Sequence, residues 1–525
     1  MQLENLLGVM MNKTHIRKSF LAAAGALALG LTSNAMADAT SDVVNALVAK
    51  GVLTEEEGDL LVKGRELEQE AQKKKEKGFV GGKMNIRGYV QLRNTAMLGG
   101  DKGVNLWSDR SVGDDQSLNN QDHNFLIRRA RIIFSGDVGD RLSYYIQPDF
   151  ASSVGGTSNS NSNGAGNFAQ LRDAYGDVYI TKDRVHRIRV GQSKVPYGFE
   201  NLQSSSNRLG LDRADALNSA VRDERDLGAF YYYTPDNVQK LFEEINKAGL
   251  KHSGNYGMFA LGLYNGQGAN ARDQNDNYHV VSRFTYPWKT DSGQIFEMGI
   301  QGYTGKYVVT PESYRTSLNR SEVTALNLAQ PAVNASTDGL IPAVAIGCGT
   351  VVTAPQDAAG VRSTCTPRIA NQDRRGIDDH RVGISFMMYP QPFGLQGEWN
   401  WGRTPGLDVE TNTIKATYLN GGYIQSMYKI DNFKFLDTNG TLIPFVRWQY
   451  FNGANKAESN AAKNTVNDWE LGTEWQIAPE VEFTAVYHYM NRTNLVRGAS
   501  NTTDVKEDYA NFKASALRMQ LQYNF

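Results

Sequence analysis

The last nine residues constrain the fold of this chain more than any other stretch. From Leu517 to Phe525, every odd position is apolar or aromatic and every even position is polar. Neighbouring side chains of a β-strand point to opposite faces. The pattern therefore predicts a final strand with one apolar face and one wetted face, ending at an aromatic residue.

The N-terminal residues have the features of an export signal. A basic stretch precedes a mostly apolar run over residues 20–31, and Ala35-Met36-Ala37 fits the small-x-small cleavage rule. We expect a signal peptide over residues 1–37, with translation starting at either Met1 or Met11. An exported chain with this terminal strand resembles the outer-membrane barrels of bacteria.

The hydropathy pattern of the remaining chain agrees with a barrel. No stretch after the signal approaches the ~20 consecutive apolar residues of a spanning helix, and from Met84 onward the pattern has a period of two. In hydrocarbon a sheet is stable only when it is closed, because no edge may stay unpaired. The sequence thus predicts an all-β fold, a transmembrane antiparallel β-barrel integral to the outer membrane.

Sixteen candidate strands can be placed between residues 81 and 525, the predicted barrel domain. Short and long connections mostly alternate between them, as in barrels with brief periplasmic turns and long outer loops. Residues 235–252 depart from this rule, and Pro444 is awkward inside its strand. An even strand number places both termini in the periplasm, and about sixteen strands leave room for water in the lumen. The strands begin near residues 84, 124, 140, 168, 186, 226, 254, 277, 294, 379, 394, 418, 441, 466, 481 and 512.

Residues 38–80 have helical rather than strand periodicity, so a short helical segment should precede the barrel. Two interpretations stay open, a solvated linker helix and a short periplasmic coiled coil that helps the protein to trimerise. Further along, Cys348 and Cys365 are the only cysteines and lie in one loop-like region, which makes them a candidate disulfide.

Several function classes find no support in the sequence. The net charge of −1 argues against a nucleic-acid partner. There is no H-E-x-x-H, G-x-S-x-G or phosphate-binding-loop motif. We therefore expect no enzyme activity, no catalytic residues, no metal site and no cofactor.

Arginines concentrate in the first half of the predicted barrel. Alternation places Arg87 on the lumen face of the first strand and Arg129 with Arg131 on the lumen face of the second. Arg128 falls on the opposite face, unless a β-bulge redirects it or a position near the rim lets it reach water.

More arginines follow in a long connection that could fold inward and narrow the pore, namely Arg208, Arg213 and Arg222. Two interpretations compete. The arginines either form an anion-attracting constriction, or pair with acids such as Asp173 in a neutral, hydrogen-bonded wall.

Three runs carry a resemblance to a known family. They are residues 124–131 (NFLIRRAR), residues 191–200 (GQSKVPYGFE) and the ending from Arg518 or Met519 to Phe525. They resemble the phosphate-selective porin O and P family, closely over residues 84–235 and as a pattern elsewhere. The resemblance implies a homotrimer of sixteen-stranded barrels in outer-membrane lipid. It also implies a third loop folded inward and arginines lining a path for small, phosphate-like anions.

By position, Arg128 and Arg129 match the paired arginines of the family's constriction, and Arg213 matches a loop arginine that follows an acid. Ser204 and Ser205 lie where family members carry loop hydroxyls. Asp173 lies beside the position of an acid that is thought to aid release of the solute.

Two positions depart from the phosphate-specific pattern. Tyr89 stands where those members have an arginine, and Asn201 where they have a loop lysine. We expect an outer-membrane porin for passive diffusion of small solutes with a preference for anions. The alternatives are a general non-selective porin and a structural or adhesive barrel.

Overall fold

The computed structural model describes most of the chain from Met84 onward. The chain divides into two compact units, Met1–Gly81 and Gly82–Phe525, and the second holds every element named below. The predicted signal peptide, nearly all of the helical segment and Cys348 lie outside the described residues, so these predictions are untested. The described residues are 50, 84–101, 103, 104, 106, 122–151, 169–312, 314–318, 350–353, 361–370, 375–409, 411–435, 437–496 and 508–525.

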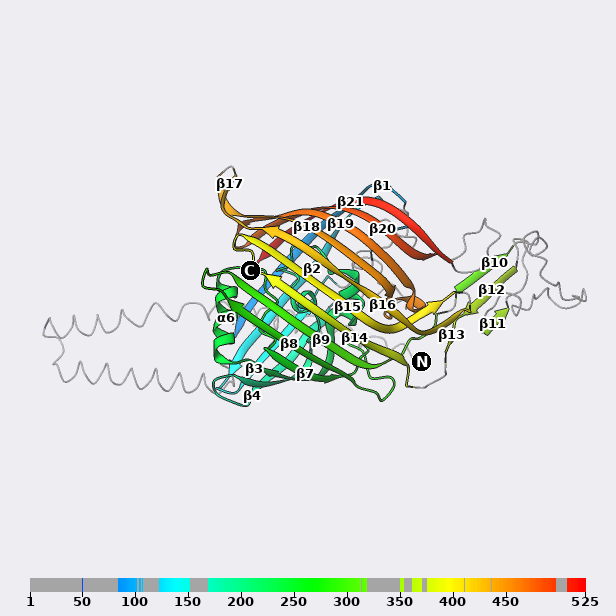
Figure 1. Cartoon of the computed structure of the whole chain (residues 1–525), viewed down its shortest axis with the longest axis horizontal. Helices are drawn as coiled ribbons and strands as arrows, with labels where there is room; N and C mark the ends of the chain where they lie inside the picture. The colour runs from blue at the N-terminus through cyan, green and yellow to red at the C-terminus, as the bar shows by residue number, and fades with distance from the viewer. Residues whose placement is uncertain are drawn as a thin grey trace, which may run out of the picture. The chain divides into compact units, whose positions relative to one another are not determined.

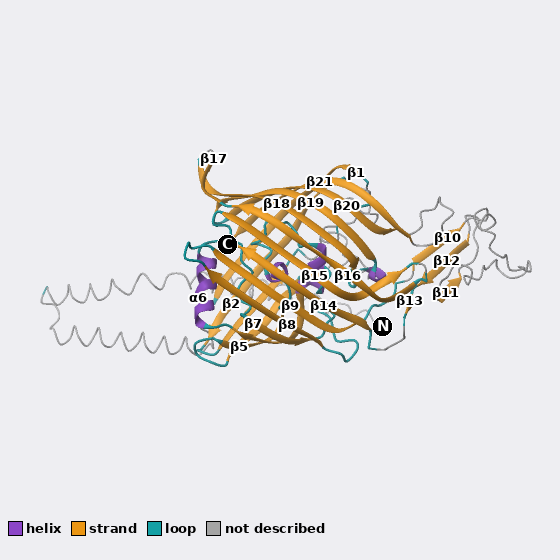
Figure 2. Ribbon diagram, viewed as in Figure 1, coloured by secondary structure: helices purple, strands orange, loops and turns teal. Residues whose placement is uncertain are grey.

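Sixteen antiparallel strands form a closed barrel (Figures 1 and 2). Each strand pairs with the next along the ring, and the last pairs with the first through contacts such as Leu92 with Leu521. This confirms the predicted fold. The strands are β1 (Asn85–Gly100), β2 (His123–Val138), β3 (Leu142–Asp149), β4 (Gln170–Tyr179), β5 (His186–Lys194), β6 (Arg225–Tyr233), β7 (Phe259–Tyr264), β8 (His279–Lys289), β9 (Ile295–Tyr307), β14 (Ile377–Met388), β15 (Phe393–Asp408), β16 (Thr413–Tyr428), β18 (Thr438–Ala454), β19 (Lys463–Ala478), β20 (Val481–Val496) and β21 (Asp508–Asn524).

Smaller elements lie outside the ring or between its strands. The strands are β13 (Arg368–Ile369), which pairs with β16, β17 (Ile430–Phe435), which pairs with β18, and the separate sheet of β10 (Tyr314–Leu318), β11 (Thr350–Thr353) and β12 (Val361–Thr366). The helices are α4 (Phe199–Leu202), α5 (Asp215–Asn218), η1 (Arg222–Glu224), α6 (Asp236–Lys247) and η3 (Ser459–Ala461). Within the described part of the chain, no helix combines the length and the apolar character needed to cross a bilayer.

Alternation in the sequence explains which face of the wall is apolar. In β21, Tyr523 is 41% exposed on the outside, whereas Arg518 and Gln522 on the other face are buried. The same division holds in β1, where Ile86 is 53% exposed and Gln91 is buried. Apolar side chains thus point outward and polar ones inward, as a bilayer requires.

The short turns gather at the end of the barrel where the C-terminus lies (Figure 1). The turn between β2 and β3 is one of these short turns, since β2 continues to Val138 and pairs there with Leu142. Pro444 is tolerated inside β18 because its position falls between the last pair with β16 and the first pair with β17. A proline there removes no ladder hydrogen bond on that side.

Candidate functional site: a charged constriction in the lumen

The connection between β5 and β6, residues 195–224, lies inside the barrel, and we call it the inward loop. Its apolar side chains are buried against the inner wall, as for Tyr197 beside Tyr423 and for Phe199 beside Phe445. The predicted inward folding is therefore seen. Because these side chains fill part of the lumen, the water-filled path is confined to the rest.

Charged side chains of the wall fasten the inward loop. The Glu398 carboxylate accepts hydrogen bonds from the backbone amides of Phe199 and Glu200, each at 2.6 Å. The Glu200 carboxylate in turn lies 2.9 Å from the Arg447 guanidinium. Arg381 donates to two loop carbonyl oxygens, at 3.0 and 2.8 Å. These bonds hold the loop to β14, β15 and β18.

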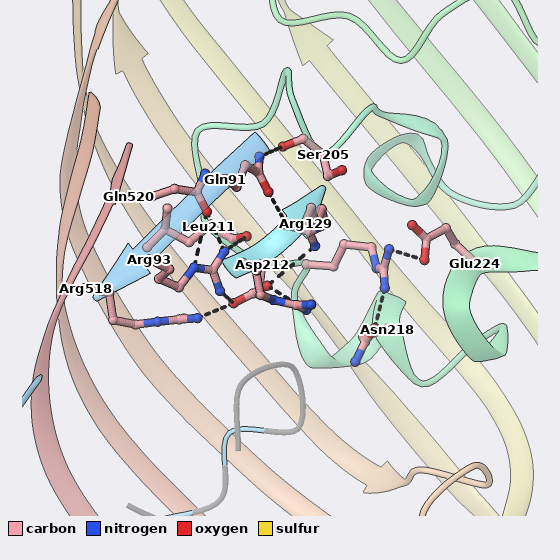
Figure 3. Close-up of polar contacts among 12 residues, drawn as sticks. Gln91, Arg93, Arg129, Ser205, Leu211, Asp212, Asn218, Glu224, Arg518 and Gln520 are labelled. Atoms are coloured by element: carbon pink, nitrogen blue, oxygen red, sulfur yellow. Dashed lines mark hydrogen bonds and ion pairs between the residues drawn. The ribbon is translucent and has the colours of Figure 1, made fainter. Parts of the chain in front are cut away.

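A single loop carboxylate, Asp212, collects four arginines of the wall (Figure 3). Arg93 lies 2.8 Å from its Oδ2 and Arg518 is ion-paired to the same oxygen. Arg128 and Arg129 lie 3.5 and 3.9 Å from its Oδ1. We call these five residues the Asp212 cluster. Four guanidinium groups and one carboxylate give the five residues of the cluster a formal net charge of +3.

The arginines keep Asp212 ionised. Burial by itself would raise the pKa of this carboxyl group, but the guanidinium groups of Arg93, Arg518, Arg128 and Arg129 hold the pKa well below its usual range. The Asp212 carboxylate is therefore a permanent negative centre that orders the surrounding cations. Of the four arginine side chains, those of Arg93, Arg129 and Arg518 are buried and that of Arg128 is 28% exposed.

A β-bulge in β2 raises the number of arginines that this strand gives to the lumen from two to three. Gln91 of β1 pairs with Arg129 and Leu92 pairs with Ile127, so the register skips Arg128. This geometry lets Arg128 reach the Asp212 carboxylate on the inside, which is the exception to strict alternation that the sequence left open. The Arg128 side chain is 28% exposed while that of Arg93 is fully buried, so Arg128 is the more accessible of the two.

A second polar group lies two residues further along β2. Arg131 is 2.7 Å from Asp149, donates to the Tyr89 hydroxyl at 2.8 Å and donates to the Ser205 hydroxyl at 3.1 Å. The Tyr89 and Ser205 hydroxyls are themselves 2.7 Å apart. The structure thus brings together three residues that the sequence placed in the lumen or the loop.

The three remaining loop arginines have different surroundings. Arg213 lies 2.5 Å from the Glu224 carboxylate. Arg208 is buried, and burial and the charge of Arg213 lower its pKa to about 10. Its Nε has no hydrogen-bond partner in the described part of the chain. Arg222 is exposed on η1, and its described contacts do not include the Asp212 cluster.

A cavity of about 940 Å³, which we call the vestibule, opens beside Arg131 on the short-turn side of the inward loop. Four residues that we expected in the pore, Arg87, Ser204, Ser205 and Asp173, line this cavity. Asp173 is paired with Arg225 at 2.9 Å, which matches the neutral-wall interpretation for this pair. The charged lining residues are Arg87, Arg131, Arg189, Lys194 and Arg225 against Asp173, Glu243 and Glu482, which leaves an excess of cations.

The sequence did not lead us to expect Arg518 in the site, and it offered Asp212 only as one of several acids that could pair with the arginines. The alternation of the last strand does place Arg518 on the wetted face, so that signal was present. For Asp212 no local pattern exists, because its place depends on how the neighbouring Leu211 is buried inside the barrel.

The model of the family described as phosphate-selective porin O and P matches residues 102–330 and 346–525, well over half of the chain. No curated protein matches the sequence.

Three solved structures are similar to the chain over most of their length. The outer membrane channel DcaP of Acinetobacter baumannii is 13% identical, with 85% of this chain and 98% of that one covered and a TM-score of 0.43. The anion-selective porin from Comamonas acidovorans is 10% identical, with coverages of 84% and 99% and a TM-score of 0.41. Outer-membrane expressed OmpT of Vibrio cholerae is 10% identical, with coverages of 84% and 97% and a TM-score of 0.40.

Proposed function

Because this chain belongs to the phosphate-selective porin O and P family and is an outer-membrane porin, we propose that the Asp212 cluster makes its pore prefer anions. One observation carries the proposal, the four guanidinium groups gathered by a single carboxylate inside the lumen. A cationic constriction lowers the energy of a partly dehydrated anion and raises that of a cation. The solute diffuses through without a chemical step.

The preference extends to small anions in general rather than to phosphate alone. Tyr89 offers a neutral hydroxyl, which already accepts from Arg131. Asn201 is 2% exposed and donates to the Leu217 carbonyl oxygen, so it points into the loop and not into the path. Losing two cationic donors weakens a phosphate-specific site. A general non-selective porin is the second candidate, and these two positions favour it.

The same proposal covers assembly, processing and orientation. Residues 1–37 are a signal peptide that is removed on export, and residues 38–80 form a periplasmic segment that assists a homotrimer. The short turns and the C-terminus share one mouth of the barrel (Figure 1). Outer-membrane barrels carry short turns on the periplasmic side, which supports periplasmic termini. An open vestibule of about 940 Å³ supports a channel over a plugged, purely structural barrel.

Reversal potentials in planar bilayers test the anion preference. With unequal KCl on the two sides, we expect a potential whose sign shows chloride to be more permeant than potassium. A reversal potential near zero would identify a general porin. A cation preference would contradict the role given to the Asp212 cluster.

A further inference from the structure

The insertion between β6 and β7, residues 234–258, lies across the mouth that carries the short turns, and we call it the strap. Its helix, α6, is drawn over the end of the barrel where the C-terminus lies (Figures 1 and 2). At this end the other connections are mostly brief, such as residues 479–480 between β19 and β20. The strap, at residues 234–258, is much longer than such a turn.

The strap is anchored on nearly opposite sides of the ring. Lys251 lies 2.5 Å from Glu474 of β19, and both side chains are buried. Arg187 of β5 donates to the carbonyl oxygen of Asn255. From β19 the ring runs through β20, β21, β1, β2, β3 and β4 to β5, close to half of its circumference. Residues 251–255 thus bridge the lumen.

The inner side of the strap is packed against the inward loop. The buried face of α6, including Phe242 and Ile245, shares an apolar cluster with Leu209 of the loop. Gln203 donates to the Lys251 carbonyl oxygen at 3.1 Å. Loop and strap are therefore one internal body that fills one side of the lumen.

The vestibule lies between this body and the wall formed by the first strands. On the strap side it is lined by Asn246, His252 and Tyr256, and on the wall side by residues that include Arg87 and Tyr145. Residues of the inward loop, Ser204 to Asn207, also line the vestibule, which therefore lies between this loop and the strap. We propose that the strap is a second constriction, in series with the inward loop, which limits solute size at this mouth.

Two cysteine variants on the same helix test the strap. Asn246 and Lys240 are both exposed on α6, but only Asn246 lines the vestibule. Asn246→Cys and Lys240→Cys would be labelled with methanethiosulfonate reagents that carry either a sulfonate or a trimethylammonium group. We expect both reagents to lower the single-channel conductance of Asn246→Cys and neither to change that of Lys240→Cys. The sulfonate should also reduce the anion preference more than the cationic reagent does.

The unmodified protein, treated with the same reagents, controls for its own cysteines. Mass spectrometry establishes that both variants are fully labelled. Full labelling of Asn246→Cys without loss of conductance, or equal losses in the two variants, would show that the strap does not border the path. These outcomes are independent of the anion preference, since a non-selective pore would still be narrowed by a label at a true constriction.

Discussion

Arg128→Gln isolates the charge that a passing ion meets most directly. Arg128 faces the lumen through the bulge and is 28% exposed, while its partner Asp212 stays paired with Arg93 and Arg518. Glutamine keeps a polar side chain, although a shorter one, and removes one positive charge. The net charge of the Asp212 cluster falls from three to two, so we expect a smaller preference for anions.

The size of the effect follows from the charge and its distance to the path. A unit charge at ~5 Å in water contributes about 0.8 kcal/mol, and screening at physiological ionic strength reduces this to about half. The anion loses this stabilisation while the cation is relieved of an equal repulsion. Together these shifts lower the ratio of chloride to potassium permeability by roughly fourfold.

Reversal potentials of purified protein in planar bilayers measure that ratio. Arg184→Gln is the matched control, because Arg184 lies in the turn between β4 and β5 and its loss changes the total charge equally. Arg128→Lys should retain the preference. If Arg128→Gln and Arg184→Gln gave the same ratio as the unmodified protein, the guanidinium group of Arg128 would not face the solute path and the reasoning would fail.

Three further predictions concern the inward loop. Arg213→Gln should lower the anion preference less than Arg128→Gln does, since its guanidinium is only 11% exposed; a larger shift in reversal potential would place Arg213 at the narrowest point. Glu398→Gln weakens the charge-assisted hydrogen bonds to the backbone amides of Phe199 and Glu200, which reduces the stability of the loop's attachment by about 2 kcal/mol. Open-channel current noise should therefore rise. Unchanged noise would mean that these bonds do not hold the loop. The pKa of Asp212 is depressed in the folded protein, so ionised Asp212 stabilises the fold at any pH above the ordinary carboxyl pKa of about 3.9. This stabilisation is lost as the pH falls through the pKa that Asp212 has in the folded protein. The resistance of the loop to proteases should therefore persist at about pH 5 and decline only in stronger acid.

The barrel wall was predictable because its pattern is local. Alternation with a period of two marks each strand, and β20 begins at Val481 as predicted. Strand ends were less accurate: β16 begins at Thr413 rather than near residue 418, since pairing with β15 continues beyond the clearest apolar alternation. Periodicity reports which face is apolar and not where the last hydrogen bond is made.

The site was only partly predictable because it depends on contacts between distant segments. Arg129 and Arg131 were correctly placed from alternation within one strand. The inward turn of Arg128 depends on a register shift against β1, which no property of β2 alone reveals. The pairing of Asp212 with Arg518 joins residues that are far apart in the sequence, so only the closed ring brings them together.

The bulge at Arg128 also bears on how such a filter can change. Side chains on one face of a regular strand recur every second residue, about 7 Å apart, which caps the density of like charges that one strand can present. A single extra residue removes that cap by turning two consecutive arginines the same way. Insertion or deletion of one residue in β2 would therefore alter the filter more abruptly than most substitutions, while the strands around it keep their places in the wall.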